Sequence, residues 1–124
     1  MKVAALMGFV AATLVVASAL HLAGVIEDGS PPFDPHRGGI AEAVIAVVLA
    51  AGAVALARGA RRVALGSVVF ALAGFCVGLS MTIRGHATGD IAYHAAMLPL
   101  LLLALALLSR DVVSRRGRAA PRTG

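Results

Sequence analysis

The 124-residue sequence has few charged groups, one cysteine and one lysine. Charged residues make up 14% of the chain and hydrophobic residues 60%, whereas a soluble domain is about 25% charged and about 45–50% apolar. The single Cys76 excludes an intramolecular disulfide and, within an apolar run, is typical of a small packing residue. Lys2 is the only lysine, and the preference for arginine and alanine favours a GC-rich bacterial gene. An ordinary soluble domain is excluded.

The sequence also lacks the short motifs that accompany catalysis or a standard metal site. It contains no Cys-x-x-Cys, His-x-x-x-His, P-loop or Gly-x-Ser-x-Gly pattern. The middle of each apolar run has almost no polar side chains to line a conducting pore. The first run has no deep acidic residue of the kind that small multidrug transporters require. We therefore expect no enzymatic activity, and a small transporter ranks third among the functional interpretations.

Four long apolar runs occupy most of the chain, and the mean hydropathy is +0.93. A helix of roughly 20 residues spans a hydrocarbon core of about 30 Å, because each residue adds about 1.5 Å. The sequence predicts an all-α integral membrane protein, an up-down-up-down bundle of four transmembrane helices. The bundle occupies residues 1–109 and is followed by a basic tail, 110–124. The expected spans are residues 3–25, 40–57, 63–83 and 91–108.

The first run has an alternative interpretation as a cleaved signal peptide. Lys2, an apolar core and Ala17-Ser18-Ala19 together resemble such a segment and its small-residue cleavage site. However, the apolar run continues through Ile26 and reaches spanning length. Cleavage would also leave an odd number of spans and place the basic ends on opposite sides. These points favour an uncleaved helix.

The basic residues lie at alternate membrane boundaries. The net charge is +5, and only Arg37 and Arg84 fall on the side opposite to the other cations. This positive-inside pattern predicts a bacterial plasma-membrane protein with both termini in the cytoplasm. The basic tail is then expected to contact anionic lipid headgroups. We expect no nucleic-acid binding, because the cations are explained by membrane orientation.

Small residues in the third run indicate where helices pack closely. Gly74 and Gly78 form a Gly-x-x-x-Gly spacing, which lets helix backbones approach each other in lipid. Together with the absence of catalytic motifs, these small-residue helix faces favour a protein that acts by associating with other helices. It would be an accessory subunit with a protein partner or a self-associating bundle, and we expect no cofactor on this interpretation.

Three ionisable residues are expected at a similar depth near the external face. His21 lies about one turn from the end of the first span, Glu42 near the start of the second, and His94 about one turn into the fourth. Intramembrane ionisable groups usually face the bundle interior and are paired. Imidazole and carboxylate ligands suit transition metals, and two histidines at matched depth suit haem. The alternative function is therefore a metal- or haem-binding protein with a site at His21, Glu42 and His94. A structural alternative also stays open, in which Glu42 pairs with Arg37 or Arg84 and the histidines only link helices.

Two segments resemble a known class of protein. The first segment is residues 78–85, Gly-Leu-Ser-Met-Thr-Ile-Arg-Gly. The second is residues 90–94, Asp-Ile-Ala-Tyr-His, which is followed by a leucine-rich run. They resemble small four-span integral membrane proteins of GC-rich actinobacteria, and the resemblance extends over all four spans. It implies the four-span fold but transfers no activity.

Overall fold

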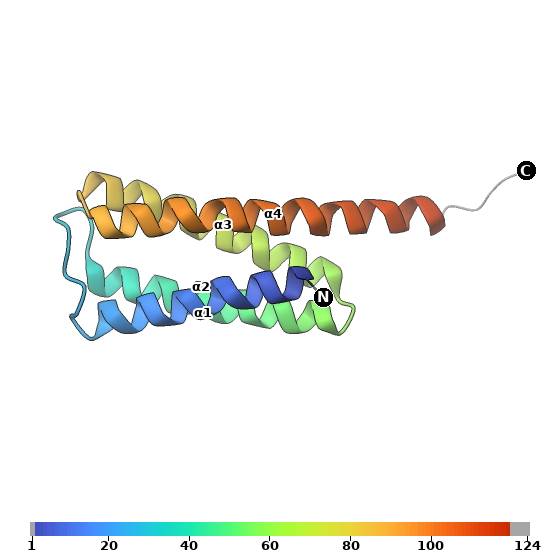
Figure 1. Cartoon of the computed structure of the whole chain (residues 1–124), viewed down its shortest axis with the longest axis horizontal. Helices are drawn as coiled ribbons and strands as arrows, with labels where there is room; N and C mark the ends of the chain where they lie inside the picture. Colours follow the sequence, from blue (N-terminus) through green and yellow to red (C-terminus); the bar gives the residue numbers. More distant parts are fainter. Residues whose placement is uncertain (1, 120–124) are drawn as a thin grey trace, which may run out of the picture.

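Four helices account for most of the computed structural model, which describes residues 2–119, with side chains described through residue 114. They are α1 (Lys2–Leu22), α2 (Pro35–Ala57), α3 (Arg61–Arg84) and α4 (Thr88–Ala119). All four are long and apolar enough to cross a membrane. The α1–α2 loop and the α3–α4 turn lie at one end of the molecule, and the α2–α3 turn lies at the other (Figure 1). The all-helical prediction with four candidate membrane spans is confirmed.

Helix α2 begins at Pro35, before the predicted start of the second span. The side chain of Asp34 accepts hydrogen bonds from the backbone N–H groups of His36 and Arg37, at 3.0 and 3.3 Å. A capping aspartate followed by proline is a favoured helix start, because the first helical position needs no N–H. The second span is predicted to start at residue 40, so the helix begins five residues earlier than the apolar run. The proline beside the cap starts the helix here.

Helix α4 is longer than the fourth apolar run at both ends. It begins at Thr88, with Asp90 in its first turn, and continues to Ala119. The predicted boundary between residues 109 and 110 therefore lies inside a continuous helix. Asp111 approaches Arg61 of α3, with Oδ2 3.9 Å from Nε. The side chains of Arg115, Arg116 and Arg118 and residues 120–124 lie outside the described part, so the tail's expected lipid contacts stay a prediction.

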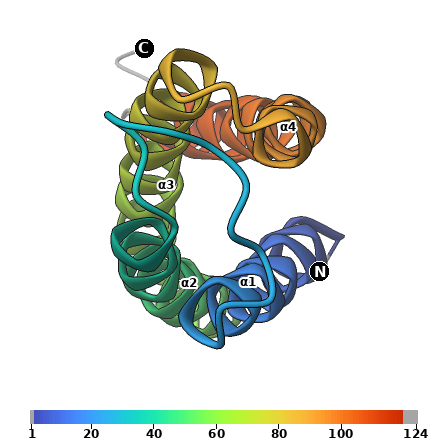
Figure 2. The ribbon, with the colours of Figure 1, turned by 90° about the vertical axis from the view of Figure 1, so that its left-hand side faces the viewer.

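Consecutive helices pack around one apolar core in the order α1, α2, α3 and α4 (Figure 2). Helices α1 and α4 pack together less closely than the other three neighbouring pairs. The largest fully buried side chains come from all four helices and include Phe75, Met7, Leu14, Leu49 and Leu101. Many large apolar side chains elsewhere, such as Val15, Val47 and Val77, are more than half exposed. This inside-and-outside distribution suits a bundle whose outer surface contacts lipid.

Glycines on α2 and α3 allow the closest helix contacts. A Cβ at Gly52 would overlap the Ser67 side chain. A Cβ at Gly74 would meet Ile45 of α2, and one at Gly78 would meet the His94 ring of α4. Gly74 and Gly78, which the sequence singles out for helix packing, therefore face other helices of the same chain.

The long loop between α1 and α2 crosses the end of the bundle and contacts the α3–α4 turn (Figure 2). The backbone N–H and hydroxyl of Ser30 donate hydrogen bonds to the Gly85 carbonyl, at 2.8 and 3.2 Å. A Cβ at Gly85 would collide with Phe33 and with the Ser30 carbonyl. The loop thus closes one end of the bundle by docking on its own chain.

The contact at Gly78 gives a first testable prediction. Gly78→Ala should lower the free energy of unfolding in detergent by about 1–3 kcal/mol, because the added methyl group forces the His94 ring out of place. Gly66→Ala is the matched control on the same helix, since nothing lies within 4 Å of its Cβ position. That control should be neutral or slightly stabilising. Equal thermal melting of the two variants would contradict the packing described here.

Candidate functional site

A histidine lies between two carboxylates near the loop-covered end of the bundle. His21 of α1 has its Nδ1 atom 2.8 Å from Oε2 of Glu42 on α2. Its Nε2 atom is 3.1 Å from Oδ2 of Asp90 on α4. The three residues are 3%, 5% and 5% exposed. One imidazole therefore joins three helices through charged or charge-assisted contacts, and we refer to His21, Glu42 and Asp90 as the acid–imidazole–acid cluster.

Close packing of α1 against α2 fixes the position of His21. The Ser18 hydroxyl donates a 2.7 Å hydrogen bond to the backbone carbonyl of Gly39. A Cβ at Gly39 would lie 2.9 Å from Cβ of His21, closer than side-chain carbons normally approach. Phe33 from the loop contacts the imidazole edge-on, with ring centroids 6.2 Å apart. These neighbours hold the ring and cover it on the loop side.

The two contacts of His21 constrain the number of protons in the cluster. Each short contact needs one proton between the two heavy atoms, because a lone pair facing a carboxylate oxygen is repulsive. Both protons can reside on the imidazole, or one can reside on the imidazole and one on a carboxyl group. The net charge is −1 in either arrangement. A charge of this kind within a bundle is costly unless a cation compensates it.

His94 belongs to a neighbouring contact and does not touch His21. Its Nδ1–H donates a 2.7 Å hydrogen bond to the backbone carbonyl of Asp90. The opposite edge of the ring faces Gly78, and Phe75 lies edge-on with ring centroids 5.2 Å apart. Asp90 is thus the residue that links the two histidines, because its side chain contacts His21 and its backbone holds His94.

An apolar groove of about 560 Å³ opens beside the cluster, between α1 and α4. The α1 side includes Phe9, Thr13, Val16 and Ala17, and the α4 side includes Asp90. Tyr93 also lines it, and its hydroxyl lies 3.0 Å from the Thr13 hydroxyl. We call this feature the α1–α4 groove. Its volume is in the range of small-molecule sites, and its walls are apolar with a few polar groups, as such sites usually are.

Asp28 adds a second carboxylate at the same end of the groove. It comes from the loop and lines the groove together with Asp90. One of its oxygens lies 4.0 Å from the Cβ position of Gly89. Of the two carboxylate oxygens of Asp90, only Oδ2 has a hydrogen-bond partner among the described residues. The groove is therefore lined by apolar side chains along most of its length and by two carboxylates at one end.

The structure brings together part of the predicted metal site. His21 and Glu42 are in contact, whereas His94 is bonded to a backbone carbonyl instead. Glu42 pairs with His21, and the expected alternative partner Arg37 lies beside Asp34. Within residues 2–119, no three His, Cys, Asp or Glu side chains have an arrangement that could hold a metal ion. Metal or haem binding stays a prediction.

Sequence reasoning missed Asp90 as a member of the cluster. The predicted fourth span begins at residue 91, so Asp90 lies just outside it. The available signal was its depth, because Asp90 lies one helical turn before His94 and at the same end as His21. That placement alone could not show that its side chain faces α1.

Comparisons with known proteins place the chain in no group. No protein-family model matches it, and neither a curated protein nor a solved structure is similar enough to count as a match.

Proposed function

We propose that this chain is a non-enzymatic, four-span plasma-membrane protein that acts by association, with the α1–α4 groove as its binding surface. The observation that carries the proposal is the groove itself, which lies where neighbouring helices pack least closely and combines an apolar wall with acidic groups. Gly74 and Gly78 contact the chain's own helices, so they are less available for an external partner. The accessory-subunit form of the proposal places a segment of a second protein in the groove.

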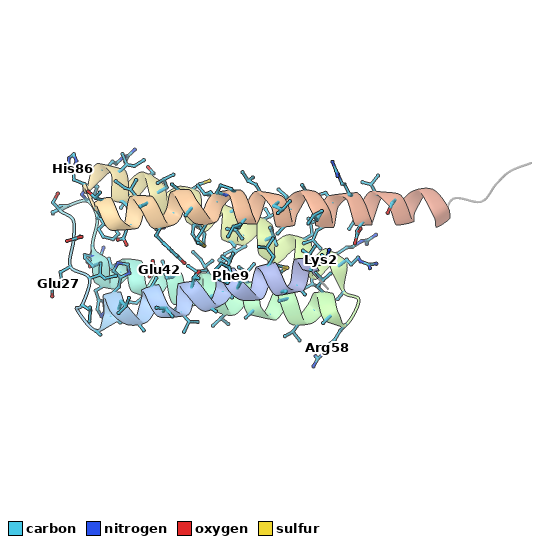
Figure 3. All side chains as sticks on the ribbon, in the orientation of Figure 1. Lys2, Phe9, Glu27, Glu42, Arg58 and His86 are labelled. Atoms are coloured by element: carbon cyan, nitrogen blue, oxygen red, sulfur yellow. The ribbon has the colours of Figure 1, made fainter. Side chains whose placement is uncertain are left out.

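The charge distribution supports an orientation for this proposal. Lys2 and Arg58 lie at one end of the bundle, whereas Glu27 and His86 lie at the other (Figure 3). By the positive-inside rule, the end with Arg58 is cytoplasmic. The chain then crosses a bacterial inner membrane in up-down-up-down order, with both termini inside. The acid–imidazole–acid cluster lies near the external face.

Photo-cross-linking tests whether the groove is a binding surface. A photoreactive residue at Val16, which lines the groove, should capture a discrete adduct in native membranes. Val47 on α2 is the matched control, because it is similarly exposed, at 69%, and lies outside the groove. A small-molecule adduct unique to Val16 supports ligand binding, and a protein-sized one supports the accessory-subunit form. The same adducts at both positions would contradict the proposal.

A second candidate function is metal or haem binding, because two of the predicted ligands, His21 and Glu42, are in contact. Their imidazole nitrogen and carboxylate oxygen lie 2.8 Å apart, whereas Asp90 contacts the opposite ring nitrogen and is not placed to bind the same ion. A transition metal bound to Nδ1 of His21 and to Glu42 would displace the proton between them. Elemental analysis and a visible spectrum of tag-free protein test this candidate. Stoichiometric metal or a Soret band that disappears in His21→Ala would establish it, and metal-free, colourless protein would exclude it.

A further inference from the structure

We propose that the α1–α4 groove binds an amphiphilic cation, a protonated amine with an apolar chain, whose ammonium group lies at Asp90 and Asp28. This inference rests on the groove being a binding surface and adds the chemical class of its occupant. Three observations carry it: the apolar walls, the two carboxylates at one end, and the excess negative charge of the cluster behind Asp90.

Charge complementarity selects a cation. Asp90 belongs to a cluster with a net charge of −1, and Asp28 contributes another negative charge at the rim. Among the described residues no lysine or arginine pairs with either carboxylate, and Arg37 is engaged by Asp34 at 3.5 Å. A bound ammonium would donate hydrogen bonds to the carboxylates. Such charge-assisted bonds are stronger than neutral ones, especially where water is partly excluded.

The extent of the groove favours a small molecule over a spanning helix. Along α1 it extends from Phe9 to Leu20, which corresponds to about 17 Å of helix at about 1.5 Å per residue. On α4 it includes only Gly89, Asp90 and Tyr93, little more than one turn. A partner helix packed along α1 would meet α4 over little more than this one turn. An apolar chain with a single charged head fits the groove.

A titration with three probes of equal chain length tests the charge preference. Dodecylamine, dodecanol and dodecanoic acid share one apolar chain and differ in head-group charge. The protein contains one tyrosine and no tryptophan, so the emission of Tyr93 reports directly on the groove. We expect dodecylamine to bind more tightly than the other two probes to the full-length protein in dodecyl maltoside.

Asn replacements identify the carboxylates that hold the head group. Asp90→Asn should weaken dodecylamine binding by about tenfold or more and leave dodecanol binding nearly unchanged. Asp28→Asn, on the exposed loop, should cost about two- to fivefold. Asp111→Asn at the opposite end removes the same charge and should have no effect. Comparing each variant with wild type for the same probe cancels the partitioning of that probe into micelles.

The outcomes separate this inference from the proposed function. Ala17→Leu should fill the groove and weaken the binding of all three probes. Ala50→Leu, on an exposed face of α2, should weaken the binding of none. If Ala17→Leu blocks binding but dodecylamine shows no preference and no dependence on Asp90 or Asp28, the amphiphilic-cation inference fails and the groove remains a binding surface. If no probe binds, or Ala17→Leu has no effect, the amphiphilic-cation inference fails, and photo-cross-linking at Val16 still decides whether the groove binds a protein segment. Thermal melting shows that each variant is folded, and Asp28→Asn keeps the test decisive if Asp90→Asn unfolds.

Discussion

Replacing His21 by alanine is expected to lower the free energy of unfolding by about 3–5 kcal/mol, because it removes the group between two buried carboxylates. Glu42 and Asp90 would then face each other across a cavity without the imidazole that contacts both. Thermal melting in mild detergent measures the loss. His36→Ala removes the same side chain from an exposed position and should change stability little. A His21 variant that melts with this control would contradict the cluster.

Replacing the whole cluster by apolar residues should behave differently. In a triple variant with leucine at His21, Glu42 and Asp90, no charge stays buried. Replacing a buried ionic group by packed apolar side chains is often neutral or stabilising. We expect the triple variant to recover most of the stability lost by His21→Ala, while losing the dodecylamine preference. Recovery of stability would indicate that the cluster is retained for binding, and failure to recover would indicate that it is needed for folding.

Gly52→Ala is expected to lower the free energy of unfolding by about 3 kcal/mol, near the upper end of the cost of overpacking. The new methyl group would overlap the Ser67 side chain of α3. Ser67 has little freedom to move, since its hydroxyl donates a 2.8 Å hydrogen bond to the Ala64 carbonyl. The Met7 side chain lies 3.0 Å from the same Cβ position. Chemical or thermal unfolding in detergent measures the effect.

Two further variants show whether the close α2–α3 contact causes that loss. Ser67→Gly should restore part of the stability of Gly52→Ala, because it removes the colliding side chain. Gly8→Ala adds the same methyl group on α1, where nothing lies within 4 Å, and should be neutral or slightly stabilising. Loss of stability in Gly8→Ala equal to that in Gly52→Ala would contradict a specific contact.

The candidate site was partly visible in the sequence. The depth of His21, Glu42 and His94 followed from counting residues along the apolar runs, because a transmembrane helix has a nearly fixed rise. The residues that each of these side chains contacts could not be predicted from depth. A residue at a given depth can face lipid or any neighbouring helix, and only packing decides which. Asp90 meets His21 because α1 and α4 are brought together by the helices between them, whereas His94 is turned toward Gly78 of α3.

The sequence by itself determined the number of helices, the position of the apolar part of each and their suitability for a membrane. These properties depend on local composition and on the length of each apolar run. Tertiary structure decided which side chains share a site. The α1–α4 groove exists because these two helices pack less closely than the other neighbouring pairs, and its acidic end exists because the loop carrying Asp28 folds over the start of α4. Both depend on contacts between residues about 60–80 positions apart, which no local pattern specifies.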